Sequence, residues 1–122
     1  MLVNIPYLEG QDINQDGSLK GIVIEKSKGR PIVMMVQGNF CGYCTKAKPD
    51  FSQFAKQTPG VFVVTVQTDG SDSDRAAAKN LSAVNKAPGV PSFLGFDKNG
   101  KFKSIHNGGR DVASLQAFAK SL

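Results

Sequence analysis

Two uninterrupted apolar runs, separated by a segment with helical periodicity, constrain the fold of this chain more than any other feature. Residues 32–36 read IVMMV and residues 61–67 read VFVVTVQ. Such runs are typical of strands that are buried on both faces of a sheet. Between the runs, apolar residues recur at steps of three and four from Cys44 to Ala55, which predicts an amphipathic helix. The order strand, helix, strand predicts an α/β fold that begins with a parallel pair.

The C-terminal half predicts a helix, a β-hairpin and a closing helix. Residues 74–84 have a helical composition with Asp72 or Asp74 as the N-cap, and a loop follows over residues 85–91. Strands are expected at 92–96 and 101–106, because Asn99-Gly100 between them is a strong hairpin signal. Asp111 is expected to cap the last helix. One face of that helix carries Val112, Leu115, Phe118 and Leu122.

Three further local features concern the N-terminal third of the chain and the central helix. Residues 2–8 predict an edge strand that tolerates Pro6, and residues 18–26 fit a strand or a helix. Residues 12–17, DINQDG, match the opening of an EF-hand loop, but Val23 stands where the bidentate Glu is needed, so an ordinary turn is expected. Pro49 lies inside the central helix and predicts a kink rather than an end.

Length and charge limit the class of protein. A chain of 122 residues predicts a single domain over residues 1–122, and we expect it to be monomeric. The net charge of +5 comes without a nucleic-acid-binding motif, and no apolar run is long enough to cross a membrane. The first residues lack the features of a secretory signal, which weakly favours the cytoplasm.

Cys41 and Cys44 are the only cysteines of the chain. Zinc needs four ligands, and the chain adds only one histidine, His106, which we expect to be a surface residue. Covalent haem needs a histidine where Thr45 stands. A purely structural disulfide across so short a loop would add little to the stability of the fold, because it removes little entropy from the unfolded chain. Redox chemistry remains, with no metal and no organic cofactor.

The position of the pair at a strand-to-helix junction supports this chemistry. Cys41 would lie at a helix N-terminus, where free N–H groups and the helix dipole favour the reactive thiolate. Cys44 lies one turn deeper and could attack a mixed disulfide formed at Cys41. Gly42 and Tyr43 would form the turn that lets the two sulfur atoms meet.

Four segments resemble the thioredoxin superfamily, which includes thioredoxins and disulfide-isomerase domains. They are FCGYC at 40–44, Pro49 five residues later, GVPSF at 89–93 and NGGRD at 107–111. The resemblance covers roughly residues 30–122, and residues 1–29 match only loosely. It implies a thioredoxin fold, in which helices flank a central mixed sheet.

The resemblance also implies a role for individual residues. Cys41 would be the nucleophile and Cys44 the resolving thiol. Pro91 would follow a cis peptide bond, and Arg110 would tune the proton affinity of the second cysteine. Val90 would offer backbone hydrogen bonds to an extended substrate. The residues expected to contact substrate are Phe40, Gly42, Tyr43, Gly89 and Val90.

Two departures from the family pattern affect the expected reactivity. The family commonly buries an Asp or Glu six residues before the nucleophile, but Met35 stands there and cannot accept a proton, so we expect slow resolution by Cys44. The CGYC sequence is found in isomerase-type members. This sequence favours a reduction potential nearer ~−180 mV than the ~−270 mV of thioredoxin.

These observations predict a thiol–disulfide oxidoreductase that acts on protein disulfides or dithiols and exchanges electrons with a reductase or oxidant partner. Two alternatives stay open. One is a glutaredoxin-like enzyme that uses glutathione, because Gly108-Gly109 followed by Asp111 is similar to a glutathione site. The other is a non-catalytic interaction module whose CxxC is vestigial, consistent with Met35 and with the absence of tryptophan.

Overall fold

A four-stranded mixed sheet forms the centre of the computed structural model, which describes residues 2, 4–82 and 89–122. Its spatial order is β2 (Phe62–Gln67), β1 (Ile32–Gln37), β3 (Ser92–Phe96) and β4 (Phe102–Ile105). β1 pairs in parallel with β2 and antiparallel with β3, and β3 pairs antiparallel with β4. The predicted α/β class and mixed sheet are confirmed.

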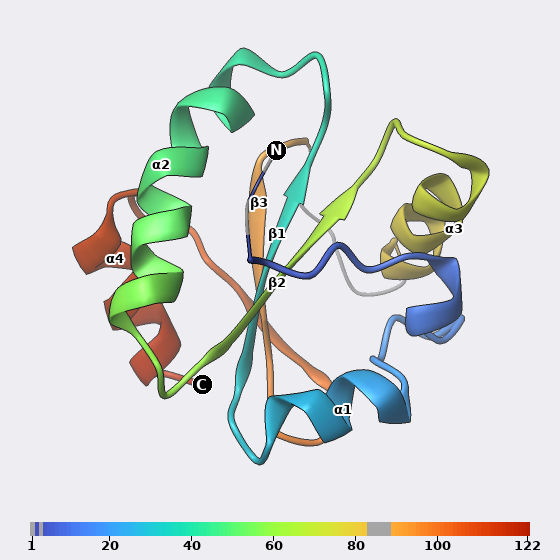
Figure 1. The fold of residues 1–122 in the computed structure, drawn as a ribbon, viewed down its shortest axis with the longest axis horizontal. Coiled ribbons are helices and arrows are strands. Elements are labelled where there is room, and N and C mark those ends of the chain that lie inside the picture. The colour runs from blue at the N-terminus through green and yellow to red at the C-terminus, as the bar shows by residue number, and fades with distance from the viewer. Residues whose placement is uncertain (1, 3, 83–88) are drawn as a thin grey trace.

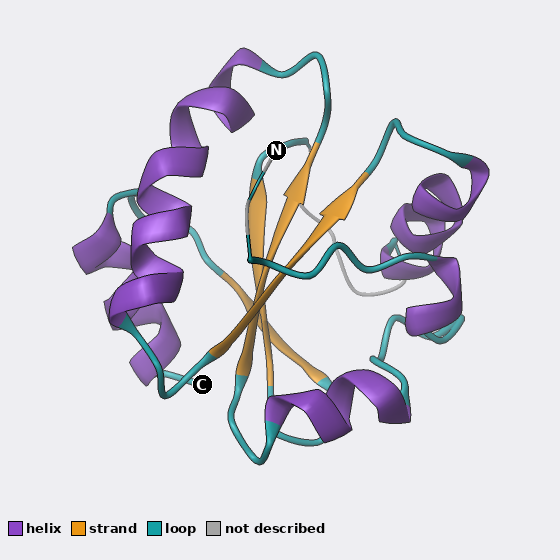
Figure 2. Cartoon of the chain, in the orientation of Figure 1, coloured by secondary structure: helices purple, strands orange, loops and turns teal. Residues whose placement is uncertain are grey.

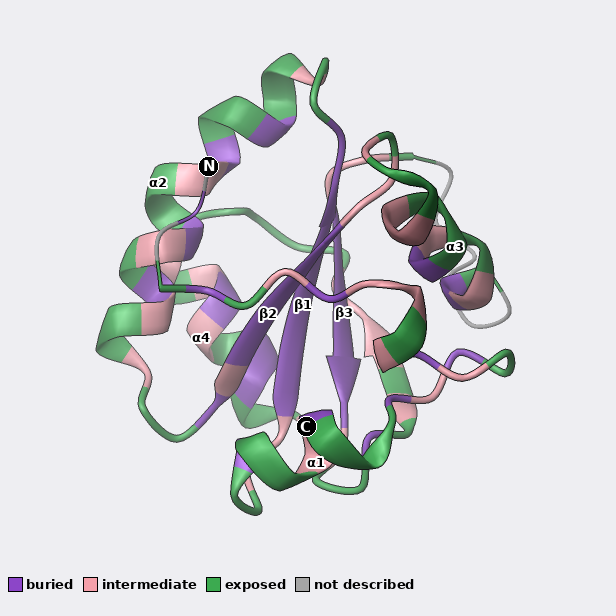
Figure 3. Ribbon diagram, turned by 45° about the vertical axis from the view of Figure 1, so that its right-hand side comes forward, coloured by how far each residue is buried: buried purple, intermediate pink, exposed green. Residues whose placement is uncertain are grey.

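Helices cover both faces of this sheet (Figures 1 and 2). α2 (Gly42–Gln57) and α4 (Val112–Lys120) pack on one face, and α1 (Gly21–Ser27) and α3 (Asp72–Leu81) pack on the other. β1 therefore contributes to both cores, and all six of its residues are buried (Figure 3). This position explains its apolar run, because a strand covered on both faces has no solvent side on which to alternate.

α2 carries the predicted periodicity into the core. Its buried residues are Cys44, Ala47, Phe51 and Phe54, which recur at steps of three and four. Pro49 lies inside the helix, so α2 does not end there. The helix begins directly after Cys41, which is its N-cap.

The N-terminal segment runs beside β2 but is not the edge strand expected for residues 2–8. Among the described residues of this segment, only Tyr7 forms a bridge, which pairs it with Thr65. Leu8 N donates to Thr65 O, and Thr65 N donates to Pro6 O. The ladder cannot continue toward the N-terminus, because Pro6 has no N–H to donate and Asn4 has a positive φ of 64°. A short 3-10 helix, η1 (Gly10–Asp12), follows.

The ambiguous segment and one helix cap are also resolved. Residues 21–27 are helical, with Val23 and Ser27 buried one turn apart. The cap of α3 is Ser71 rather than Asp72 or Asp74, because the Ser71 side chain accepts the N–H of Asp74 and the Asp74 carboxylate accepts the N–H of Ser71. The end of the helix predicted over 74–84, and most of the loop predicted over 85–91, lie outside the described residues.

The C-terminal predictions are confirmed. β3 and β4 form a hairpin in which Gly100 N donates to Asp97 O, and Gly100 has the positive φ of 78° that favours glycine. Asp111 caps α4 by accepting the N–H of Ser114. Leu115 and Phe118 are buried against the sheet. Within the described part of the chain, every helix is too short or too polar to span a bilayer.

Candidate active site

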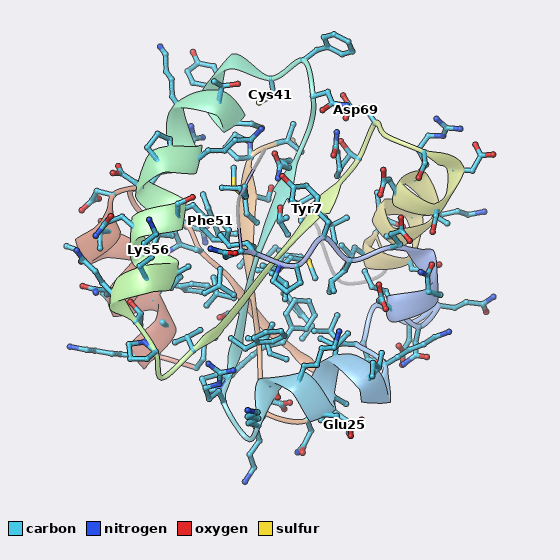
Figure 4. The ribbon with its side chains drawn as sticks, in the orientation of Figure 1. Tyr7, Glu25, Cys41, Phe51, Lys56 and Asp69 are labelled. Carbon is cyan, nitrogen blue, oxygen red and sulfur yellow. The ribbon has the colours of Figure 1, made fainter. Side chains whose placement is uncertain are left out.

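The loops that follow β1 and β2 are tied together at one end of the sheet. The backbone N–H of Asn39 donates to both carboxylate oxygens of Asp69, at 2.8 Å each. Thr68 N donates to Gln37 O at 2.8 Å. These contacts fix the connection from the end of β1 to the start of α2, which carries Cys41 (Figure 4).

Cys41 is the N-cap of α2 and is partly exposed. Its Sγ accepts the backbone N–H of Cys44 at 3.1 Å and lies 3.6 Å from the carbonyl oxygen of Val90. An N–H aimed at the sulfur, together with the helix N-terminus, stabilises negative charge there. Cys41 thus has the predicted setting at the strand-to-helix junction.

Cys44 has the opposite environment. Its side chain is fully buried, and that burial, followed by its hydrogen bond with Cys41, raises the pKa of the Cys44 thiol from 9.0 to about 11. A backbone hydrogen bond with Gly38 and the charge of Lys48 lower this pKa and only partly offset the increase. Both cysteines are free thiols, so these contacts belong to the dithiol form.

Lys48 was not recognised as a site residue from the sequence. Its spacing of four residues from Cys44 could have revealed it, because residues four apart lie on the same side of a helix.

The surroundings of Cys44 provide no buried carboxylate. Met35 is fully buried in the same core cluster as Cys44. Among the described residues, the buried polar side chains are those of Ser27, Gln37, Thr65 and Ser92, and none is an acid. The Cys44 proton therefore has no internal carboxylate acceptor among the residues that the structure describes.

The second wall of the site comes from the segment before β3. The antiparallel register pairs Val36 with Ser92, so Pro91 lies next to the end of β1. The Val90–Pro91 peptide bond is cis. Val90 packs against both core clusters and directs its carbonyl oxygen toward the Cys41 sulfur. Gly89, just before it, is exposed.

Two large hydrophobic side chains beside Cys41 are exposed to solvent. Phe40 is 98% exposed and Tyr43 is 64% exposed; the only other large hydrophobic residue so exposed within the described ranges is Ile22. Gly42, between the cysteines, is also exposed, and a Cβ there would have no neighbour within 4 Å. An apolar surface around the sulfur suits contact with another molecule.

Arg110 reaches the same surface from the loop before α4. Its Cζ lies 5.7 Å from the centre of the Tyr43 ring. Arg110 and Val90 line a pocket of about 290 Å³ that also includes Ile105, His106 and Asn107. Ile105 and His106 were not recognised from the sequence as residues that border the site, because their approach depends on the pairing of β3 with β4.

His106 lies at the surface but is half-buried. Its ring packs 4.8 Å from that of Phe118, and its Nε2 lies 2.7 Å from Gly109 O. It therefore holds the loop that carries Arg110. Within the described residues, no group of three or more His, Cys, Asp or Glu side chains could hold a metal ion.

Comparison with known proteins gives the family. The model of the thioredoxin-like domain matches residues 21–120. The chain belongs to the thioredoxin-like family. The resemblance noted in the sequence is thus confirmed, and the match includes both cysteines and Pro91.

Individual relatives agree with this assignment. The thioredoxin-like protein 453L of Invertebrate iridescent virus 6 is 29% identical over 103 residues, which cover 74% of this chain and 69% of the viral protein. The structure of Fasciola hepatica thioredoxin is 27% identical with a TM-score of 0.63, and the match covers 82% of this chain and 88% of that one.

The J-Trx1 fragment of ERdj5 is similar in fold, with a TM-score of 0.67 at 22% identity over 96% of this chain. The chain spans half the length of that fragment.

Proposed function

We propose that this thioredoxin-like domain is a thiol–disulfide oxidoreductase that exchanges its Cys41–Cys44 pair with disulfides of other proteins. The observation that carries the proposal is the asymmetry of the two sulfur environments. Cys41 is accessible and accepts an N–H at 3.1 Å, whereas Cys44 is buried one turn behind it. An accessible nucleophile in front of a buried thiol suits sequential attack and resolution.

The exchange proceeds in two steps. The Cys41 thiolate attacks one sulfur of the substrate disulfide, forming a mixed disulfide and releasing the other sulfur as a thiolate. Cys44, once deprotonated, attacks the Cys41 sulfur, which forms the Cys41–Cys44 disulfide and releases the second substrate thiolate. The two electrons of the protein dithiol reduce the substrate disulfide, and the two protons finish on the substrate thiols. A dithiol partner reverses the process and restores the reduced protein.

The carbonyl of Val90 would take part in substrate binding. In the dithiol form it lies within reach of the Cys41 thiol at 3.6 Å. A thiolate has no proton to donate, so ionisation of Cys41 would leave this carbonyl available to an N–H of an extended substrate. The exposed rings of Phe40 and Tyr43 would add apolar contact around the sulfur.

The proposal is tested by reduction of a protein disulfide with wild type, Cys41→Ser and Cys44→Ser proteins. Cys41→Ser should lose all turnover, and Cys44→Ser should accumulate a mixed disulfide at Cys41 that mass spectrometry detects. If Cys41→Ser still binds its partner and wild type shows no turnover, the domain is an interaction module instead. A parallel assay with glutathione as the only reductant tests the glutathione-dependent alternative.

A further inference from the structure

Tyr43 lies close to two cationic side chains, one from α2 and one from the loop before α4. Lys46 Nζ is 5.9 Å and Arg110 Cζ is 5.7 Å from the centre of the Tyr43 ring. Both distances are within the range of cation–π contacts. All three side chains are exposed to solvent. We call Tyr43, Lys46 and Arg110 the cationic rim.

The positive charge of the cationic rim is not neutralised by ion pairs. Within the described ranges the single ion pair joins Arg75 and Asp72 at α3, so Lys46 and Arg110 have no described carboxylate within 4.0 Å. Two of the acidic residues near the site have other partners, and Asp50, four residues after Lys46 on α2, forms no ion pair within the described part of the chain. The Asp111 carboxylate accepts hydrogen bonds from Ser114, and the Asp69 carboxylate accepts the N–H of Asn39.

The cationic rim is also connected to the nucleophile. Val90, whose carbonyl oxygen is 3.6 Å from the Cys41 sulfur, lines the same pocket of about 290 Å³ as Arg110. Tyr43 is two residues from Cys41 at the start of α2. A peptide that brings a sulfur atom to Cys41 along Val90 therefore passes next to Arg110.

We propose that the preferred substrates are protein disulfides with Asp or Glu within a few residues of the reactive cysteine, and that Lys46 and Arg110 bind these carboxylates. This inference rests on the proposed function and names its substrate class. The carboxylate takes no part in the electron transfer, which follows the two steps given above.

Elementary electrostatics makes the preference measurable. In free solution, carboxylates beside a disulfide repel an approaching thiolate and slow the exchange. Two cations at the mouth of the site would reverse this effect by attracting the substrate and holding its acidic residue. The contribution of exposed charges falls as salt increases, so the preference should weaken at high ionic strength.

The test uses three disulfide peptides that differ only in the residues flanking the cysteines, which are Glu, Gln or Lys. The rate constant for reduction by the reduced protein is divided by that for dithiothreitol, which corrects for intrinsic reactivity. We expect the Glu peptide to be favoured over the Lys peptide by about five- to tenfold at low salt, as for two exposed charge pairs. Equal ratios, or a preference for Lys, would overturn the inference.

Charge variants assign the preference to particular residues. Lys46→Gln with Arg110→Gln should bring the corrected Glu-to-Lys ratio close to one, and Lys46→Glu with Arg110→Glu should invert it. The matched control is Lys26→Gln with Lys101→Gln, which removes the same charge from exposed positions at α1 and the β3–β4 hairpin. If the control pair abolishes the preference equally, the cationic rim is not its source.

Two further outcomes separate the possible failures. If Arg110 acted only on the Cys44 proton, its loss would slow all three peptides by the same factor and leave their ratios unchanged, which contradicts substrate recognition. If wild type reduces none of the peptides faster than Cys41→Ser, the proposed oxidoreductase function itself fails. Turnover without charge preference contradicts the present inference alone.

Discussion

At the scale of single residues, the proposed thiol–disulfide exchange depends on how Cys44 loses its proton. Its thiol is fully buried with a pKa raised to about 11, and Met35 occupies the same core cluster without offering a proton acceptor. Burial, the largest cause of this increase, persists when Cys41 is held in a mixed disulfide, so the Cys44 thiol should stay mostly protonated at neutral pH and resolution should be slow. Lys48 is the charged group that assists ionisation, but it only partly offsets the effect of burial.

Introducing a carboxylate should therefore accelerate resolution. We expect Met35→Asp to increase the rate of mixed-disulfide resolution by about tenfold or more, because a positioned base accelerates proton removal. The measurement is biphasic release of thionitrobenzoate from Ellman's reagent, in which the first equivalent reports attack by Cys41 and the second reports resolution by Cys44.

Met35→Asn is the matched control, since it has the same shape but accepts no proton at neutral pH. Acceleration of the second phase in both variants would point to loosened packing, and acceleration in neither would contradict this account of Cys44.

The same raised pKa should affect stability above pH 9. The unfolded chain releases the Cys44 proton near 9.0, whereas the folded protein keeps it up to about 11. Between these values the folded state binds more protons, so the free energy of unfolding falls as pH rises, by roughly 2 to 3 kcal/mol in total. Denaturant titrations at a series of pH values should show that the free energy of unfolding falls more steeply between pH 9 and 11 in wild type than in Cys44→Ala. Parallel pH dependences would show that Cys44 is not the group responsible.

At the scale of elements, the close approach of α4 to β3 depends on Gly95. A Cβ at Gly95 would lie 2.9 Å from Cζ of Phe118 in α4, and it would also clash with the side chain of Leu122 just beyond the helix. Gly95→Ala should therefore destabilise the protein by about 1 to 3 kcal/mol through overpacking, as measured by chemical denaturation.

The control for this prediction is Gly21→Ala at the start of α1. A Cβ there has no neighbour within 4 Å, and alanine favours a helix over glycine. Equal loss of stability in both variants would mean that packing beneath α4 is not the cause.

Elements with a strong local or periodic pattern could be predicted from the sequence. β1 followed from its apolar run, α2 from the spacing of its apolar residues, and the hairpin from Asn99-Gly100. The segment 21–27 could not be assigned, because Ile22, Val23 and Ile24 favour strands by local preference and only burial of Val23 under the sheet selects the helix. Local preference is weak enough for tertiary packing to override it.

In the candidate site too, features set by the local sequence could be predicted, and features set by tertiary packing could not. The Cys41–Cys44 pair was recognisable because its spacing and its position before α2 are local features of the sequence. The approach of Lys48, the support of the Arg110 loop by His106, and the pocket shared by Arg110 and Val90 depend on how distant segments pack. The sequence alone could not give these contacts.

At the scale of the whole molecule, residues 4–20 are part of the folded core although the family match begins at residue 21. Gly10 N bonds to Ser73 Oγ, and the Asn80 side chain bonds to Ile13 O, which attaches this segment to α3. Leu8, Ile13 and Leu19 are buried in the core between the sheet and α3. The segment therefore covers the outer side of β2 and belongs to the hydrophobic core.

Truncation of a side chain in this segment should lower stability as strongly as truncation in the matched domain. Ile13 is 1% exposed, so Ile13→Ala should reduce the free energy of unfolding by about 2 to 4 kcal/mol. Ile22→Ala is the control. Ile22 is 49% exposed, so its truncation should change the free energy of unfolding only slightly. A small effect of Ile13→Ala in thermal and chemical unfolding would show that the segment is only loosely attached.

The most direct test of the central claim is the redox equilibrium of Cys41 and Cys44 in graded glutathione buffers, with free thiols read by alkylation and mass spectrometry. We expect one two-electron transition to an intramolecular disulfide, at a potential higher than the ~−270 mV of thioredoxin and toward ~−180 mV. A value at or below that of thioredoxin would contradict the oxidising character that we attribute to the pair. Failure to form the disulfide in any of the glutathione buffers would contradict the oxidoreductase function itself.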